Sequence, residues 1–332
     1  MTKSYRNDVS RVPFFSIIIP TRNRVSLFCE ALESAIGQDC SDTEIIVVND
    51  GATNETLAEY RKLEKKYENA QFHYLVHRAN GHGPGYSRNY GAAQASGRYL
   101  CFLDDDDYWS DHGHLSRAKR SIQNYEGEVD LFLTNQEAFD VQGTQILPNP
   151  WINDLTARLP VAIDSEGTRV VQPPFLLTSR GFPHLNCTIF RRDFYTSIGG
   201  IDENLGYEED RDAYLRGIDV AEHILLNPAV VSYHRVPDLQ KSENVSTKLP
   251  QYRKRIYQLS VYEKGALTAK SSEIREFCSR GKGYQLKHLA QLLESEKRYK
   301  LAARYAWQGF AILPTLPWLA KSTYLTLRAI FE

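Results

Sequence analysis

The sequence has no long apolar run, few cysteines and almost no net charge. In 332 residues, no stretch approaches the ~20 consecutive apolar residues of a membrane-spanning helix. Residues 1–11 are polar, unlike a secretory signal peptide. The five cysteines lack CxxC spacing, which argues against a disulfide framework or a zinc site. With 40 basic and 41 acidic residues, the protein has no net positive charge that would attract nucleic acid. We therefore expect a cytoplasmic protein with free thiols and no nucleic-acid partner.

The residues that are present suit an α/β enzyme. Hydrophobic residues make up 42% of the chain, enough for a sizeable core in one large domain or two. Short apolar runs, each followed by a polar loop, alternate with segments of helical spacing. The expected strands are 14–19, 44–48, 72–76 and 98–103, and the expected helices between them are 27–38 and 55–67. This alternation predicts a doubly wound, mostly parallel sheet with flanking helices. Ligands of such sheets bind outside the carboxyl ends of the strands.

Four consecutive aspartates, Asp104 to Asp107, follow the last of these strands. Adjacent anions repel one another, so folding alone does not favour them beside a core; a solvated acidic loop is the alternative. Mg²⁺ typically binds through one or two carboxylates plus substrate phosphates. We predict a metal–diphosphate site, in which a divalent ion stabilises a leaving phosphate as a Lewis acid. Asp105 should point away from the ion because side chains alternate in an extended segment, and Asp107 is either a second ligand or a helix N-cap.

A glycine-rich loop at 80–91 precedes that strand. Its alternating glycines allow close approach of the backbone to a ligand, and the residues after them predict a helix N-terminus suited to anions. A plain turn before a helix is the alternative. The loop is neither a Walker A sequence nor a dinucleotide fingerprint. Arg88, near the start of this helix, could pair with a phosphate or a base, or lie on the surface.

The second half of the chain offers weaker signals. Prolines interrupt residues 143–185, which we interpret as an acceptor-binding segment, with a mobile linker as the alternative. Glu209 and Asp210 precede a predicted helix, where carboxylates are often only partners of the helix dipole. His234 ends a predicted late strand and could be a metal ligand or a structural histidine.

Four motifs in order resemble the nucleotide-sugar-binding half of a family 2 glycosyltransferase with the GT-A fold. They are Ile17–Arg24, Ile45–Ala52, Ser87–Gly91 and Phe102–Asp107, and they lie within residues 14–110. Any one of them alone would be unspecific. One departure is Asn49, where the family commonly has Asp. Asp50 is therefore the carboxylate expected to contact the nucleotide base, and the identity of the nucleotide stays open.

The resemblance implies a role for each matched residue. Asp104 and Asp106 form the DxD motif, and similar enzymes carry a basic or histidine residue at the position of His234. The implied general base is Asp210, with Glu209 as acceptor contact or orienting partner. The metal ligands that we expect, for Mg²⁺ or Mn²⁺, are Asp104, Asp106 and His234. The residues expected to bind the nucleotide sugar are Pro20, Thr21, Arg22, Asp50, Arg88, Asp104 and Asp105.

These expectations define a function and its alternatives. We expect a metal-dependent inverting transferase that moves a single sugar from a nucleotide sugar, a UDP-sugar by preference, to a saccharide or glycolipid acceptor in surface polysaccharide synthesis. The QxxRW signature of processive synthases is missing. The alternatives are a sugar-nucleotide nucleotidyltransferase, for which 20–24 lacks a basic glycine-rich loop, and a non-catalytic nucleotide-binding scaffold.

We expect three regions along the chain. Residues 1–110 are the nucleotide-sugar-binding half, 111–249 the acceptor-binding and catalytic half, and 250–332 a C-terminal helical extension. The apolar tail at 310–319 is expected to cap the catalytic core as a helix. The alternative is peripheral contact with the cytoplasmic face of a membrane, which would bring the enzyme to a lipid-linked acceptor.

Overall fold

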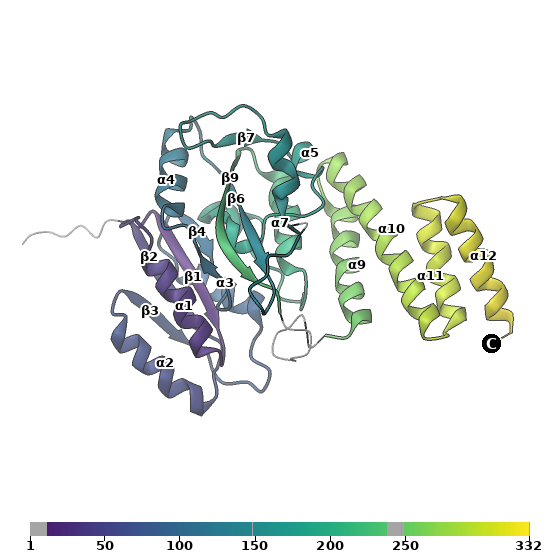
Figure 1. Ribbon diagram of the computed structural model, residues 1–332, viewed down its shortest axis with the longest axis horizontal. Helices are drawn as coiled ribbons and strands as arrows, with labels where there is room; N and C mark the ends of the chain where they lie inside the picture. Colours follow the sequence, from purple (N-terminus) through teal and green to yellow (C-terminus); the bar gives the residue numbers. More distant parts are fainter. Residues whose placement is uncertain (1–11, 148, 238–246, 248, 332) are drawn as a thin grey trace, which may run out of the picture.

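A mixed sheet forms the centre of the protein, and a row of helices extends from one side of it (Figure 1). The computed structural model describes residues 12–147, 149–237, 247 and 249–331. In this part of the chain, nine strands form the sheet in the order β3-β2-β1-β4-β8-β6-β9-β5, with β7 also paired to β9. The strands are β1 Phe15–Thr21, β2 Thr43–Asn49, β3 Ala70–Tyr74, β4 Tyr99–Phe102, β5 Tyr108–Trp109, β6 Leu131–Phe139, β7 Arg169–Val171, β8 Thr188–Arg191 and β9 Ile224–Arg235.

Helices cover both faces of the sheet and then continue beyond it. The helices around the sheet are α1 Val25–Ile36, α2 Asn54–Lys66, α3 Pro84–Gln94, α4 His114–Asn124, α5 Pro173–Leu176, α6 Arg192–Ser197 and α7 Glu209–Val220. The extension consists of α9 Gln251–Thr268, α10 Ser272–Ser295, α11 Tyr299–Ile312 and α12 Leu316–Ile330.

Six of the strands point in one direction, which confirms the predicted doubly wound, mostly parallel sheet. β1, β2, β3 and β4 pair in parallel, and β8 then runs against β4. β6 is antiparallel to β8 and parallel to β9, so both point the same way as β1. β5 and β7 run against β9. Because β8 is reversed, its first residues lie at the edge where the parallel strands end.

β1 runs through Pro20 to Thr21, two residues further than the predicted strand. Pro20 pairs with Val48, but the pairing of β1 with β4 stops at Ile18. Beyond Ile18 the β4 side of β1 carries no ladder hydrogen bond, so the missing N–H of a proline costs nothing there. This extension brings the Thr21 side chain to the end of the sheet.

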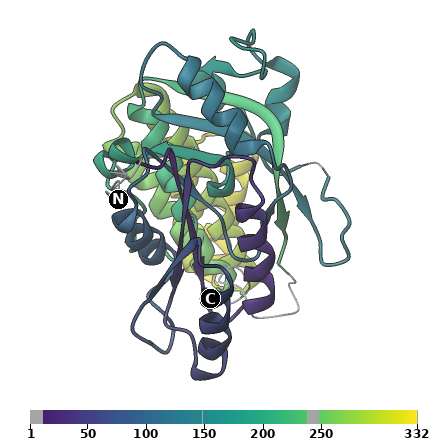
Figure 2. The same cartoon turned by 90° about the vertical axis from the view of Figure 1, so that its left-hand side faces the viewer.

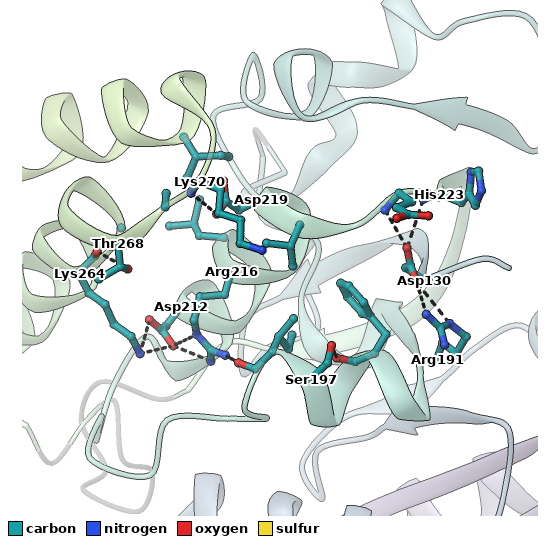
Figure 3. Close-up of a pocket in the computed structure, with 18 of the residues that line it drawn as sticks. Asp130, Arg191, Ser197, Asp212, Arg216, Asp219, His223, Lys264, Thr268 and Lys270 are labelled. Carbon is teal, nitrogen blue, oxygen red and sulfur yellow. Dashed lines mark hydrogen bonds and ion pairs between the residues drawn. The ribbon is translucent and has the colours of Figure 1, made fainter.

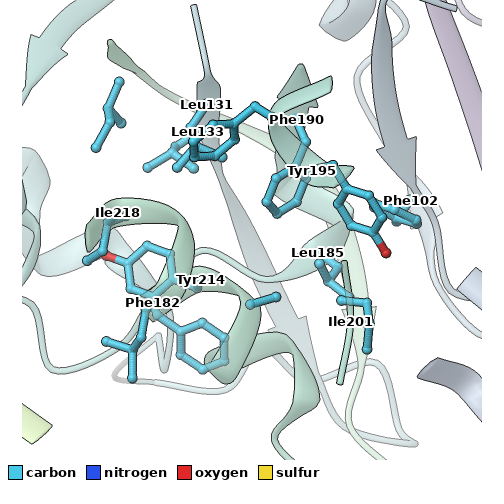
Figure 4. Packing of buried hydrophobic residues seen from close by; sticks show 14 of the residues in the cluster. Phe102, Leu131, Leu133, Phe182, Leu185, Phe190, Tyr195, Ile201, Tyr214 and Ile218 are labelled. Carbon is cyan, nitrogen blue, oxygen red and sulfur yellow. The ribbon is translucent and has the colours of Figure 1, made fainter. Parts of the chain in front are cut away.

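Two apolar cores lie on the two faces of the sheet. Ile17 and Ile19 pack with Phe28 of α1 in one core, whereas Ile18 belongs to the other. Both faces are covered, so the parallel strands are continuous apolar runs. The second core includes a cluster of aromatic rings, in which Phe102 and Tyr195 have centroids 5.4 Å apart (Figure 4).

The outer part of the C-terminal extension forms its own small core, whereas α9 and the start of α10 join a core of the sheet. α9 packs against α7, and α10, α11 and α12 follow, each against the helix before it (Figure 1). In the view of Figure 2 this extension lies behind the sheet. The last three share a cluster built on small residues such as Ala290, Ala302 and Ala306, which let the helices approach closely. The predicted helical extension is therefore confirmed. The tail, however, packs on α10 through α11 and α12 and does not cap the catalytic core as expected. No helix in the described residues combines the length and apolar character needed to cross a membrane.

The predicted regional boundaries at 110 and 249 stay predictions. The sheet itself continues across the first of them, since β4 before it and β8 after it are hydrogen-bonded neighbours.

The contact of α3 with the sheet depends on Gly91. A Cβ atom at this position would lie 2.6 Å from Ile18 Cγ2, a methyl group fixed in a buried strand. We expect Gly91→Ala to lower the free energy of unfolding by about 1–2 kcal/mol, because overpacking outweighs the gain in helix propensity. Urea unfolding followed by circular dichroism measures the change.

Gly217→Ala in α7 is the matched control. Its Cβ would meet Leu131 Cδ1 at 3.4 Å, an ordinary contact, so the same chemical change should be neutral or stabilising by up to about 1 kcal/mol. Equal stability of the two variants would contradict the close packing of α3 on β1.

Candidate active site

The predicted site residues meet at the carboxyl edge of the parallel strands. β1, β2 and β4 are parallel and in register, so Thr21, Asp50 and the run that begins at Asp104 lie side by side there. β9 ends at the same edge and brings His234. The reversed strand β8 contributes the segment just before it, which includes His184. The loops that the sequence places at the ends of these strands therefore meet at one edge of the sheet.

A buried guanidinium joins the two predicted halves of the site. Arg88 of α3 is only 5% exposed; its Nη2 donates to Asp104 Oδ1 at 2.6 Å and its Nη1 to Glu209 Oε1 at 3.0 Å. Burial alone would raise the pKa of Asp104, but the charge and hydrogen bond of Arg88, together with the nearby His184 and His234, hold this pKa far below its ordinary value. Asp104 is therefore a permanent carboxylate, and Glu209 is fixed at the start of α7.

Arg22 and Asp50 hold the glycine-rich loop against the ends of β1 and β2. The Asp50 carboxylate accepts hydrogen bonds from the backbone N–H groups of His82 and Gly83, at 2.7 and 3.0 Å, and from His82 Nδ1 at 2.8 Å. Arg22 Nη2 donates to the carbonyl of Arg78 at 2.9 Å. At Gly81, with φ of +71°, a Cβ would lie 2.3 Å from Asp50 Oδ2, so only glycine fits. Both predicted nucleotide-binding residues thus shape this loop.

Asp105 and Asp106 share Arg24, a residue of the first motif to which the sequence assigned no role. Arg24 Nη2 lies 2.7 Å from Asp105 Oδ1, and Nη1 lies 2.6 Å from Asp106 Oδ2. Asp105 is buried against the loop after β1, on the side away from Arg88. Burial, joined by the charge of Asp107, raises the pKa of Asp106 to about 7. Asp106 therefore holds a proton more readily than an exposed carboxylate does.

Asp107 is a fully buried acceptor. Its oxygens accept hydrogen bonds from Asn186 Nδ2 at 2.6 Å, His234 Nδ1 at 2.8 Å and the backbone N–H of Arg235 at 2.8 Å. The expectation that Asp107 caps a helix is wrong, because β5 follows it and pairs with β9. Burial would lower the pKa of His234, but Asp107 raises it to about 9. With Nδ1 held by a carboxylate, Nε2 is the nitrogen that His234 can offer to a ligand, the arrangement typical of a metal-binding histidine.

His184 stands between the DxD motif and the predicted base. Its Nε2 is 3.7 Å from Asp104 Oδ2 and 3.8 Å from Asp210 Oδ2. Burial lowers the pKa of His184, which favours the neutral imidazole. At Asp210, burial and the charge of Glu208 raise the pKa to about 6. Trp151 packs on both imidazoles, with its ring centroid 5.1 Å from His184 and 5.2 Å from His234.

The sequence did not identify His184. It lies in the proline-interrupted segment, in no recognisable motif, and reaches the site because β8 runs antiparallel to β4. The signal that could have found it is its place just before a predicted strand of the opposite direction. Trp151 comes from the same segment, so part of 143–185 lines the site.

The donor atoms fit a divalent cation. One oxygen each of Asp104 and Asp107 and one nitrogen of His184 lie within 4.8 Å of one another. Carboxylate oxygens with an imidazole nitrogen suit Mn²⁺, and the carboxylates suit Mg²⁺. Of the ligands predicted from the sequence, Asp104 is in this group, His234 adjoins it through Asp107, and Asp106 turns toward Arg24.

The start of α7 is held from the C-terminal extension. Glu208, with a left-handed φ of +65°, pairs with Arg211 and accepts a hydrogen bond from Gln258 Nε2 of α9 at 2.8 Å. The Arg211 guanidinium also lies over the Phe182 ring, 4.3 Å from its centroid. These contacts fix the turn that carries Glu209 and Asp210.

A cavity of about 690 Å³ lies elsewhere, between α6, α7 and the first two helices of the extension (Figure 3). Charged side chains that line it form ion pairs, for example Asp212 with Arg216 and Lys264. Among the described residues around it are none of the predicted catalytic or nucleotide-binding residues. Asp212, close in sequence to the predicted base, therefore serves the packing of α7 against α9.

Comparisons with known proteins agree with this geometry. The family model described as glycosyl transferase family 2 matches residues 16–197. A Campylobacter jejuni protein, GalNAc(5)-diNAcBac-PP-undecaprenol beta-1,3-glucosyltransferase, is 38% identical over 96 residues, 29% of this chain and 30% of that protein. A Bacillus spizizenii poly(ribitol-phosphate) beta-glucosyltransferase is 39% identical over 95 residues, 28% of this chain and 15% of that protein. The matches cover less than a third of the length of the first such relatives.

Solved structures extend the likeness over nearly the whole chain. Staphylococcus aureus TarS 1–349 in complex with UDP-GlcNAc superposes with a TM-score of 0.64 at 19% identity, covering 90% of this chain and 81% of that one. The mannosyltransferase PcManGT from Pyrobaculum calidifontis, in complex with GDP-Man and Mn²⁺, gives 0.58 at 18% identity, covering 97% and 87%.

At such identities the structures show the fold alone, but the family model covers more than half of the residues, in the region that holds the DxD motif and Arg88. The chain belongs to glycosyl transferase family 2.

Proposed function

We propose that this protein is a metal-dependent inverting glycosyltransferase that moves a single sugar from a nucleotide sugar to a saccharide or lipid-linked acceptor. The observation that carries the proposal is the position of His184, within 4 Å of both Asp104 of the donor motif and Asp210 of the acceptor side. A transferase needs these two carboxylates on either side of one anomeric carbon. Family membership and the UDP-GlcNAc complex of TarS support a nucleotide-sugar donor.

The donor side is the edge formed by β1, β2 and β4. In this proposal the base lies beside Asp50 and Arg22, under the loop that they hold, and Thr21 and Pro20 form the floor at the end of β1. Asp104 and Asp105 face the ribose and diphosphate, with Arg88 fixing Asp104. A UDP-sugar is the donor that we favour, because TarS was solved with UDP-GlcNAc.

The diphosphate side would hold Mg²⁺ or Mn²⁺. We assign the ligands to Asp104, Asp106 and His234, with Asp107 orienting His234 and His184 adjoining Asp104. A divalent cation held there supplies a Lewis acid that stabilises negative charge on the departing diphosphate. The protein contributes the ligand geometry and excludes water through Trp151, which covers both imidazoles.

The acceptor side is the start of α7. The acceptor hydroxyl attacks the anomeric carbon on the face opposite the diphosphate, which inverts its configuration, and its proton passes to Asp210. Burial places the pKa of Asp210 at about 6, so the group is largely ionised at neutral pH and is a stronger base than an exposed carboxylate. Glu209 is held by Arg88 and orients this turn.

The relatives point to an acceptor in the cell envelope. The Campylobacter jejuni relative is named for an undecaprenol-linked acceptor and the Bacillus spizizenii relative for poly(ribitol-phosphate). By analogy we propose a surface polysaccharide or its lipid-linked precursor, and a location in the cytoplasm or at the cytoplasmic face of the membrane.

The metal assignment predicts the behaviour of Asp106→Asn. Because a ligand is lost while the shape is kept, we expect the gain in UDP affinity on adding Mn²⁺ to fall at least about tenfold. Isothermal titration calorimetry with UDP, in Mn²⁺ and in EDTA, measures it. Asp111→Asn, which alters a carboxylate paired with Arg117 outside the site, is the control and should behave as wild type.

His184→Asn distinguishes the two possible ligand sets. If Mn²⁺ dependence survives in Asp106→Asn and is lost in His184→Asn, the cation belongs to the group of Asp104, Asp107 and His184. If both variants keep it, both ligand sets are wrong. If Mn²⁺ does not raise the UDP affinity of the wild type, the metal dependence itself is wrong.

The base assignment predicts that Asp210→Asn separates chemistry from binding. The amide keeps the shape of the carboxylate but removes its basicity, so kcat should fall by about 10²–10⁴-fold while donor affinity stays near wild type. Steady-state transfer assays and calorimetry with the donor measure the two quantities.

Glu222→Gln, an exposed carboxylate just beyond α7, is the control and should leave kcat unchanged. Transfer by Asp210→Asn at the wild-type rate would exclude Asp210 as the base. Loss of donor binding together with rate would place Asp210 in the nucleotide site and make Glu209 the candidate.

A further inference from the structure

The last helix, α12, has one apolar face packed inside the protein and a second apolar face exposed. Ser322 and Leu325 are buried against α11. On the opposite side of the helix, Leu316, Leu327 and Ile330 are 82%, 55% and 70% exposed. Their spacing of 11 and 3 residues places them on one line along the helix. An apolar stripe that is not needed for packing indicates an interaction surface.

Aromatic side chains border this stripe. Trp307 of α11 is exposed, and its Nε1 donates to Thr326 Oγ1 of α12 at 2.9 Å, which ties it to the edge of the stripe. Tyr324 is exposed on the other side, and Phe331 extends the stripe at its end. Tryptophan and tyrosine combine an apolar ring with a polar tip, which suits the boundary between lipid and water.

Basic side chains outnumber acidic ones around the stripe. Residues 294–332 contain six cationic side chains and three glutamates, Glu294, Glu296 and Glu332, in a protein whose net charge is -1. The six are Lys297, Arg298, Lys300, Arg304, Lys321 and Arg328. Arg298 pairs with Glu296 and Lys321 with Glu294, and Arg328 Nη2 donates to the Tyr299 hydroxyl at 2.9 Å. The segment is thus a cationic, amphipathic end of the molecule, and it lies farthest from the sheet (Figure 1).

We propose that α11 and α12 bind the surface of an anionic lipid bilayer, with the stripe of Leu316, Leu327 and Ile330 inserted at the level of the headgroups. A basic amphipathic helix of this kind lies in the plane of the interface and does not span the membrane, which agrees with the lack of a spanning helix in the described chain. Anionic headgroups complement the cations of the segment.

A second copy of this chain fits the surface less well. A symmetric dimer places the same patch on itself, so a segment in which six cations stand against three glutamates would face its own copy. Like charges across an interface oppose association. The excess of positive charge therefore favours lipid over self-association.

Vesicle flotation with the full-length protein tests this surface. We expect wild type to bind vesicles of phosphatidylglycerol and phosphatidylcholine, to bind pure phosphatidylcholine weakly, and to lose binding as salt rises. Leu327→Glu with Ile330→Glu should weaken binding about tenfold or more, because it removes apolar contact and adds repulsion. Arg304→Gln with Arg328→Gln should weaken binding to the anionic vesicles alone.

The matched control carries the same charge change at two other exposed apolar positions, Val161→Glu and Leu267→Glu. It should bind as wild type does. All substitutions are on the surface, and circular dichroism checks that each variant is folded. The assay needs no donor or acceptor, so its outcome is independent of the proposed transfer activity.

Three results would overturn the proposal. They are no flotation of wild type with anionic vesicles, equal flotation of the stripe variant and wild type, and equal loss in the control. Light scattering after size-exclusion chromatography measures whether the wild type and the stripe variant are monomers or dimers. A wild-type dimer that the stripe variant dissociates, without vesicle binding, would assign the face to a second copy.

Discussion

The buried guanidinium of Arg88 determines where both halves of the site lie. It pairs with Asp104, after β4, and with Glu209, at the start of α7, which are more than a hundred residues apart in sequence. Two carboxylates in a crevice repel each other, and Arg88 offsets that repulsion from a rigid helix packed on the sheet through Gly91. Removing one partner of a buried pair leaves an uncompensated charge, at a typical cost of about 3–5 kcal/mol. The position of Asp104 relative to Glu209 therefore depends on this one side chain.

The first half of the fold could be predicted because each strand there is an apolar run that ends in a polar loop. The same rule fails at β6, which lies near the centre of the sheet. Its middle, Thr134-Asn135-Gln136, is polar in sequence yet almost completely buried. Tertiary contacts partner only some of these groups: Thr134 Oγ1 donates to the carbonyl of Cys187 and Asn135 Nδ2 to Asn153 Oδ1, whereas Asn135 Oδ1 and Gln136 Nε2 have no hydrogen-bond partner among the described residues. Hydrophobic periodicity carries no information about such partners, so this strand is visible only in three dimensions.

The residues of the candidate site also divide into those that the sequence predicts and those that it does not. Asp50, Asp104 and Asp210 could be identified because motifs place them at strand or helix ends, and parallel strands bring such ends together. His184 could not, because its position follows from the reversed direction of β8, which depends on long-range pairing. The partner of each carboxylate could not be predicted either. Asp106 forms an ion pair with Arg24, just after β1, whereas Asp107 accepts hydrogen bonds from Asn186 and from the backbone of β9. The local sequence determines which residues lie at the carboxyl edge of the sheet. The pairing of all the strands determines which atoms of these residues face each other.

The separate core of the C-terminal helices has a consequence for how the protein unfolds. Ala290, Ala302 and Ala306 pack only with neighbours in the extension, and α11 and α12 follow α10 in a row of nearest-neighbour contacts. Such a row can open from its free end, breaking the contacts with α10 while the two cores of the sheet stay intact. The backbone amides of α11 and α12 should therefore exchange hydrogen through local openings of lower free energy than those of β1 or β4. The molecule is then two cooperative units on one chain, and the outer unit can loosen while the crevice keeps its shape.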